Sequence, residues 1–347
     1  MMRKMTWNIR IITLLLLLTG SSIAMSNTDT KFYWIATESA PKHYPMEIIR
    51  GTFIYHGEAE QGLYIPSGGT LKKGWGDPIS SHTVGEKFKP LPDRLKIYFF
   101  SLTEKQFYEG EFDLPYEKIL ALFREGVANA TASPDGEVPI YTRIMAGIAP
   151  GGVVAVWVTG QDTKEVFFGQ AQKVELNPSA AFALPFKDKA DSDLYMKEIL
   201  ESSTTPEERE SLQKNGIPFG LWARYRNRYD WLPTFTQGHH PVEGGVDVSY
   251  LNGEYIVNWN PADKKELNKP RPVPQQASFM TVMNGQNVLF TIDFDEFETM
   301  AAFEKLGASN KKVFIEFEPR MPRTDIKIRL YNDKESIELK KFNSEDW

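Results

Sequence analysis

The sequence contains no cysteine among its 347 residues. This absence excludes disulfide bonds, cysteine nucleophiles, thiol redox chemistry and cysteine metal sites. Stability must therefore come from hydrophobic packing, and the chain is long enough for one large or two ordinary domains. Aromatic residues make up 13% of the chain, including 8 Trp and 14 Tyr, so large side chains are available for a core or for a contact surface.

Recognisable catalytic motifs are lacking as well. The histidines are His43, His56, His82, His239 and His240. None forms the helical i, i+4 pair with a glutamate that zinc proteases use, and no Gly-x-Ser-x-Gly elbow occurs. The acidic stretch 293–298 coincides with a predicted helix start, where the helix dipole alone favours carboxylates. We therefore predict a protein that is not an enzyme, with no catalytic, metal-binding or cofactor-binding residues.

The first 24 residues resemble a secretory signal peptide. The start is basic, residues 11–18 are apolar, and Ser22 to Ala24 place small residues at the positions that a signal peptidase reads. The apolar run is too short to span a bilayer stably, although a retained anchor is the alternative. We expect export to the periplasm, cleavage after Ala24, and no transmembrane segment in the mature chain.

One position in this segment concerns lipid attachment. Residues 18–21 have the pattern of a bacterial lipoprotein signal, with Ser21 at the place of the lipid-carrying cysteine. A lipid cannot be attached there without a thiol. The sequence thus argues against a lipid anchor.

The charge balance excludes one class of partner. The chain has 40 basic and 46 acidic residues, and removal of residues 1–24 takes away three basic ones, leaving 37 against 46, a formal charge of −9. Nucleic acid is therefore not expected as a partner, because phosphate binding needs a basic surface. A cationic protein or surface is more compatible with this charge.

The stretch from Leu95 to Gly160 gives the clearest fold prediction. Residues 95–100 and 107–112 have strand composition and flank a polar turn. A helix follows, which we expect Asp113 to cap and Gly126 to close, with one face packed on the sheet formed by the flanking strands. Residues 141–149 and 153–158 then form a second hairpin. The predicted unit is strand, strand, helix, strand, strand.

The C-terminal part repeats this order. Asn252-Gly253 and Asn284-Gly285 predict two hairpins, and Asp295 is expected to cap a helix that precedes further strands. We predict an α+β fold of two ββαββ-like units with mainly antiparallel sheets and a candidate internal duplication. The expected divisions are a signal peptide (1–24), an N-terminal α+β unit (25–185), a helical and Arg/aromatic connector (186–245), and a C-terminal α+β unit (246–347).

The connector interleaves arginines with aromatics over residues 218–231. This pattern has two interpretations. The residues could grip an acidic partner through cation–π and bidentate contacts. Alternatively, the aromatics face the core while the arginines pair with the excess carboxylates of the chain.

Several fragments together resemble a known bacterial envelope family. They are residues 40–45, Trp75-Gly76, 95–99, 105–110, 149–152 followed by Trp157, and 221–226. Their order and spacing over about residues 30–235 are similar to the family called domain of unknown function 2931, whose members are typically small lipoproteins. That family is often associated with type VI secretion clusters that encode antibacterial lipases. The resemblance implies an immunity role, in which a periplasmic protein binds and blocks such a toxin.

Three functional hypotheses follow. The first is a non-enzymatic periplasmic binding protein with a protein partner, in particular an immunity protein against a secreted lipase. The second is an envelope module that binds glycan or peptidoglycan through exposed aromatics, and the third is an unrecognised hydrolase with dispersed carboxylates. The candidate partner-binding residues are Tyr64, Trp75, Trp222, Arg224, Tyr225, Arg226, Arg228 and Trp231.

Overall fold

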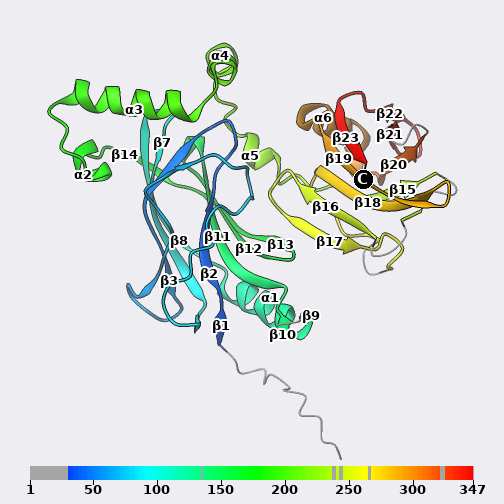
Figure 1. Ribbon diagram of the computed structural model, residues 1–347, viewed down its shortest axis with the longest axis horizontal. Coiled ribbons are helices and arrows are strands. Elements are labelled where there is room, and N and C mark those ends of the chain that lie inside the picture. The colour runs from blue at the N-terminus through cyan, green and yellow to red at the C-terminus, as the bar shows by residue number, and fades with distance from the viewer. Residues whose placement is uncertain are drawn as a thin grey trace, which may run out of the picture.

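The computed structural model describes residues 30–133, 136–236, 240–241, 245–264, 267–320 and 325–346. It shows two lobes side by side, both built mainly from strands (Figure 1). Strands hold 45% of the described residues and helices 21%. The expected α+β class is therefore wrong, and the protein is predominantly β. The predicted signal peptide, with Ser21, and His239 lie outside the described residues.

Two sheets face each other in the N-terminal half. One orders β2 (Ile35–Ser39), β11 (Tyr141–Ala149), β12 (Val153–Gly160) and β13 (Thr163–Gln170). The other orders β14 (Gln172–Val174), β8 (Gln106–Asp113), β7 (Pro92–Ser101), β3 (Met46–Tyr55) and β4 (Gly62–Tyr64), with β5 (Thr70–Leu71) also on β3. Two small ribbons pair β1 (Lys31–Tyr33) with β6 (Phe88–Pro90), and β9 (Thr131–Ser133) with β10 (Gly136–Val138).

The two hairpins of the central unit belong to different sheets. Hairpin β7–β8 is in the six-stranded sheet, and hairpin β11–β12 is in the sheet opposite. Helix α1 (Tyr116–Ala128) lies between them in the chain. The prediction of one sheet under the helix is therefore wrong. The reason is burial: Ile97 of β7 and Ile144 of β11 belong to one core, which two facing sheets can enclose.

Helix α1 also starts and ends differently from the prediction. Its N-cap is Pro115 and no side chain caps it, because Asp113 is the last residue of β8. Gly126 lies inside the helix, where a Cβ would come within 2.9 Å of the Tyr141 ring. The glycine thus permits close packing on β11 and does not end the helix.

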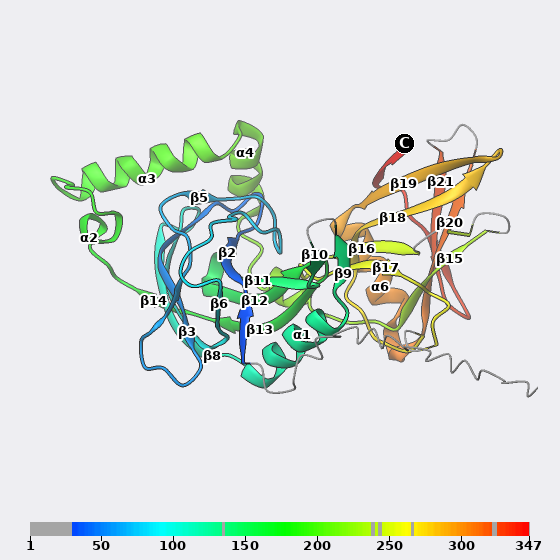
Figure 2. The same cartoon turned by 60° about the horizontal axis from the view of Figure 1, so that its bottom comes forward.

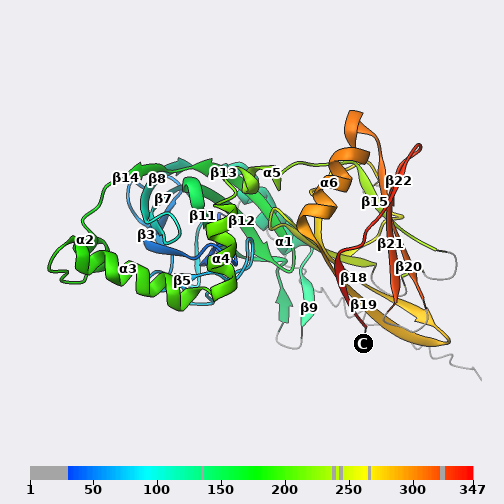
Figure 3. The same cartoon turned by 90° about the horizontal axis from the view of Figure 1, so that it is seen from above.

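A helical arm follows β14 and runs along the N-terminal lobe (Figure 3). It consists of α2 (Pro178–Phe182), α3 (Lys189–Ser203) and α4 (Pro206–Asn215), and α5 (Leu221–Arg224) comes next. The predicted capping box of Thr205 and Glu208 is present at the start of α4. No residue of α4 is buried, as its polar sequence indicates. None of the described helices is long and apolar enough to cross a bilayer.

The C-terminal half again consists of two layers. One layer orders β17 (Tyr255–Trp259), β16 (Val246–Tyr250), β18 (Pro274–Met283), β19 (Gln286–Phe294) and β23 (Phe342–Asp346). The other orders β15 (Trp231–Phe235), β20 (Val313–Pro319), β21 (Ile326–Tyr331) and β22 (Ser336–Glu338). Helix α6 (Glu296–Leu306) joins the layers and is capped by Asp295, as predicted. Single 3-10 turns occur at Pro150–Gly152 and Ala308–Asn310.

The topology of the first half recurs in the second. In both, five strands form a path in which all neighbours pair antiparallel. The two paths are β4-β3-β7-β8-β14 and β17-β16-β18-β19-β23. In both, a helix precedes the second strand of a four-strand path, whose first strand comes earlier in the chain and is parallel to the second; the paths are β2-β11-β12-β13 and β15-β20-β21-β22. The repeating unit is therefore a two-sheet layer structure that begins at β15 in the second half, within the region predicted as a connector.

Candidate functional site at the junction of the halves

The two halves meet through one pair of strand edges. Strand β13 of the first half pairs with β17 of the second at Thr163 and Tyr255, which joins their sheets into one of nine strands. Figure 2 shows the C-terminal lobe beside the β11 to β13 region of the N-terminal lobe. A single bridged pair is a weak link by itself, so side chains must hold the junction.

Tryptophans fill the space beside this edge. Trp157 on β12 packs edge-on against Trp75, with ring centroids 4.9 Å apart, and Trp75 contacts Trp222 of α5 at 6.4 Å. The indole Nε1 of Trp157 donates a hydrogen bond to the Asn252 carbonyl of the second half, at 3.0 Å. All three rings are buried in one core cluster that continues into the C-terminal half. The buried aromatic rings thus hold the two halves together by packing and by the hydrogen bond to Asn252.

The arginines after α5 pair with buried glutamates at the same place. Arg226 Nε lies 2.5 Å from Glu165 Oε1, and Arg228 Nη2 lies 2.8 Å from Glu254 Oε2. Burial raises the pKa of Glu165, and the hydrogen bond from Arg226 opposes this shift. Lys118 of α1 donates to the Glu165 carbonyl at 2.8 Å, and burial lowers the pKa of its ammonium group. The residues after α5 thus bind Glu165 of β13 and Glu254, directly before β17, while α1 binds the Glu165 backbone.

The eight candidate partner-binding residues therefore separate into two groups. Trp75, Trp222, Tyr225 and Trp231 are buried, and Trp231 Nε1 donates to the Pro272 carbonyl at 2.9 Å. Burial raises the pKa of the Tyr225 hydroxyl. Their rings face the core, as in the second interpretation of the connector.

The other four candidates reach the surface. Tyr64 is 49% exposed on β4, and the Arg224, Arg226 and Arg228 side chains are each about half exposed while bound to carboxylates. Partner binding by these exposed residues stays a prediction. The three arginines do not form one patch with Tyr64, because Tyr64 lies on an edge strand of the six-stranded sheet.

A row of polar residues crosses the nine-stranded sheet at the junction. Each member is the cross-strand partner of the next, so their side chains share one face. This polar row consists of Arg143, Thr159, Thr163, Tyr255, Ser249, Gln276 and Asp293. Adjacent members also bond to each other: the Thr159 and Thr163 hydroxyls are 2.7 Å apart, and Gln276 donates to Asp293 at 2.7 Å.

A cavity of about 380 Å³ lies over this row, and we call it the junction groove. The whole polar row lines it, together with Trp75 to Pro78 and the Gly253–Glu254 turn. Arg143 is the only arginine or lysine among its described lining residues. Its Nε is buried and has no hydrogen-bond partner within the described part of the protein. Clefts between packed units are common binding sites.

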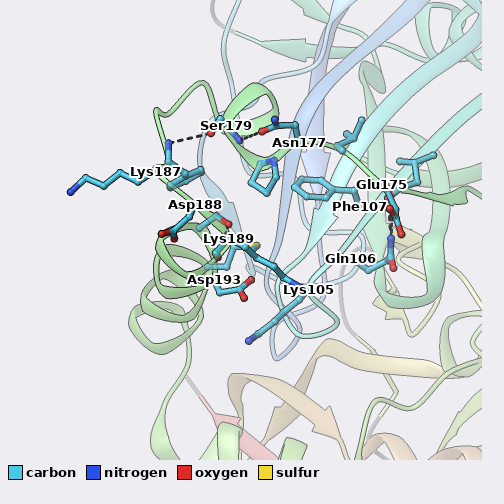
Figure 4. A pocket seen from close by; sticks show the side chains of 16 residues that line it. Lys105, Gln106, Phe107, Glu175, Asn177, Ser179, Lys187, Asp188, Lys189 and Asp193 are labelled. Carbon is cyan, nitrogen blue, oxygen red and sulfur yellow. Dashed lines mark hydrogen bonds between the residues drawn. The ribbon is translucent and has the colours of Figure 1, made fainter.

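A larger cavity of about 650 Å³ lies under the helical arm (Figure 4). Two of its polar groups serve the local backbone: Asn177 caps α2 through the Ser179 amide, and Gln106 donates to the Val174 carbonyl. In Figure 4 the Lys187 side chain extends away from Phe107 at the centre of the cavity. Because these polar groups are already engaged, the junction groove is the better candidate site.

Comparison with protein-family models gives one match. The family described as "Protein of unknown function (DUF2931)" matches residues 21–220. The chain belongs to this family. The resemblance seen in the sequence is thereby confirmed, whereas the expected absence of a lipid anchor at Ser21 stays a prediction. The DUF2931 match ends at Gly220, directly before α5, so the topologically equivalent second half lies beyond it. No curated protein and no solved structure matches the chain.

Sequence reasoning missed the polar row. One signal was available: Arg143 is a charged residue near the start of an otherwise apolar strand, Tyr141–Ala149. Such a residue in a strand is often a bound or binding group, since burial of an unpaired charge is unfavourable. The other members come from separate strands, and only their register brings them together.

Proposed function

We propose that this protein is a non-catalytic binding protein of the bacterial envelope that captures a protein partner in the junction groove. The specific form of the proposal is an immunity protein that neutralises a type VI secreted antibacterial lipase. The observation that carries the binding role is the junction groove itself, a polar cavity at the meeting of two packed units. Export to the periplasm is part of the proposal and rests on residues 1–24.

Engagement of the buried carboxylates supports binding over catalysis. Glycoside hydrolysis, for example, needs two carboxyl groups that face a substrate. Glu254 lines the groove and accepts from the Glu165 amide, and each of these two buried acids is held by an arginine that also fixes the junction. Their geometry favours a structural role, so the hydrolase hypothesis receives no support from these two residues.

Burial of the tryptophans also disfavours the glycan alternative. Sugar binding by stacking needs exposed ring faces, but Trp75 is 9% exposed and Trp222 is 1% exposed. Tyr64 is the exposed aromatic among the candidate residues. A single tyrosine at a sheet edge offers less contact area than the predicted set of aromatics would have provided.

The test is capture of the toxin encoded by the neighbouring reading frame. Purified protein should bind the purified toxin in a one-to-one complex, and cells that produce both should survive. Ser249→Trp fills the groove from the centre of the polar row and should abolish capture. Ser67→Trp adds the same side chain at an exposed loop position outside the groove and should leave capture unchanged. Absence of binding to the neighbour would remove the immunity form of the proposal.

A further inference from the structure

Arg143 occupies an unusual position in the junction groove. It lies on β11 between Thr142 and the buried Ile144, and its own side chain is partly buried. The Nε atom is shielded from solvent yet meets no acceptor in the described residues. An unsatisfied buried donor is destabilising, and such donors in native proteins call for a specific explanation, such as a ligand. Arg143 also lines the groove, and the described residues form no ion pair with its guanidinium group, so a ligand in the groove can supply one.

We propose that Arg143 receives a carboxylate from an extended peptide segment of the bound partner. This inference rests on the proposed function, and it adds the chemical class that the groove recognises. A guanidinium group matches a carboxylate with paired, charge-assisted hydrogen bonds. The hydroxyl and amide side chains of Thr163, Ser249 and Gln276 continue from Arg143 along the row and supply hydrogen bonds for a peptide backbone.

The other charges of the groove define the rest of this segment. Asp77, Glu254 and Asp293 also line the cavity, and Arg228 already neutralises Glu254. The carboxylates of Asp293 and of Asp77, which is near Lys73, oppose a doubly charged phosphate group in the groove. They favour a segment that carries a basic side chain close to its acidic one. The groove therefore selects a dipolar peptide, with its acid at Arg143 and its base toward Asp77.

The first test uses capped peptides and the unmodified protein. Acetyl-Lys-Gly-Glu-amide and acetyl-Glu-Gly-Lys-amide are compared by calorimetry with versions that carry Gln in place of Glu. At least one Glu peptide should bind about tenfold more tightly than its Gln counterpart, the difference expected for a hydrogen bond to a charged group. Equal binding of Glu and Gln peptides, or displacement by an equal concentration of inorganic phosphate, would overturn the inference.

Variants then assign the effect to one side chain. Arg143→Gln should remove the preference for Glu, and Arg143→Lys should retain part of it, because the charge is kept without the paired geometry. Arg50→Gln is the matched control: Arg50 is also on a strand, but it lies over the Tyr98 ring in the other sheet, 4.1 Å from the centroid. The Arg50→Gln variant should prefer Glu peptides over Gln peptides as strongly as the wild type does. Loss of the preference in Arg50→Gln would contradict the assignment, and circular dichroism confirms that each variant is folded.

The peptide result and the toxin result can fail separately. Preference for Glu peptides without capture of the neighbouring toxin would support the recognition chemistry and reject the immunity form. Capture of the toxin that persists unchanged in Arg143→Gln would support the binding role and overturn the assignment to Arg143.

Discussion

The two halves share a strand order but use different edges to meet. The first half contributes β13, the last strand of its four-strand path, and the second contributes β17, the first strand of its five-strand path. The equivalents of these edges in the opposite halves are β22 and β4, which are sheet ends of three residues each. A non-equivalent contact of this kind could propagate from copy to copy. Short outer edges limit such pairing.

The two halves share their strand order and differ most in the helices beside the strands. The first half is followed by the helical arm, whereas the described C-terminal residues contain α6 and one short 3-10 turn beside the strands. The Arg/aromatic segment lies between the halves and supplies Trp222, Arg226 and Arg228 to the junction. The two halves thus share a strand framework, and they are joined by residues of the Arg/aromatic segment, which occurs once in the chain.

The largest expected effect comes from removing the central tryptophan of the junction. Trp157→Ala should destabilise the protein by about 3–5 kcal/mol, as for other buried Trp to Ala changes. It should also uncouple the halves, because Trp157 contacts Trp75 and bonds to Asn252. Denaturant unfolding followed by fluorescence and circular dichroism should then show two transitions. Trp34→Ala, in the core of the first half alone, should destabilise without this separation; one shared transition in Trp157→Ala would contradict the prediction.

A smaller loss is expected when one buried acid at the junction loses its partner. Arg228→Ala leaves the Glu254 carboxylate, which is 9% exposed, without its guanidinium. The free energy of unfolding should fall by about 1–3 kcal/mol, the range for a lost hydrogen bond to a charged group. Glu254→Gln in the same background should restore part of the stability, since the charge is gone. Fully additive losses in the double variant would show that the two residues are not coupled.

The pH dependence should report a carboxyl group that β2 carries and the equivalent strand β15 lacks. Glu38 on β2 is 2% exposed; its Oε1 accepts from the Ser80 hydroxyl at 2.5 Å, and its Oε2 has no hydrogen-bond partner among the described residues. Burial raises the pKa of this carboxyl group in the folded state. Stability from the protonated form is thus complete below the unfolded pKa and is lost as pH rises through the folded pKa. Strand β15, in the equivalent position, contains no carboxylate.

Glu38→Gln removes this titration. Relative to the variant, the wild type should become less stable as the pH rises from about 4 through the raised folded pKa, as measured by urea midpoints. A constant difference between the two proteins over that range would refute the assignment to Glu38. The effect should be smaller than that of a junction variant, because the fold keeps all its contacts.

The smallest effect is expected from an exposed arginine of the same segment. Arg224 bonds to Glu304 of α6 at 2.8 Å, but both side chains are about half exposed. Exposed ion pairs contribute about 0–1 kcal/mol, so Arg224→Ala should hardly move the unfolding midpoint. A loss as large as that of Arg228→Ala would show that exposure does not separate the two arginines.

Local elements were predictable because their signals are local. The strands at β7, β8, β11 and β12 follow from runs of aromatic and β-branched residues, and the capping box at Thr205 needs only residues within one turn. The cap of α1 failed for a tertiary reason, since Asp113 is used by β8. The fold class was wrong because strands hold 45% of the described residues and helices only 21%. The sheet of each hairpin was also missed, since strand composition does not specify which sheet a hairpin joins.

At the candidate site, too, local features were predictable from the sequence and contacts between distant residues were not. The sequence alone determined the thiol-free chemistry, the family membership and the presence of an Arg/aromatic segment, because composition and local motifs need no knowledge of distant contacts. Only the tertiary structure decided that the aromatics of this segment are buried, that its arginines bind glutamates from two halves, and that Arg143 and Asp293 face one groove. The physical reason is that strand register sets which side chains are neighbours across a sheet, and register between distant strands is fixed by the packing of the whole chain.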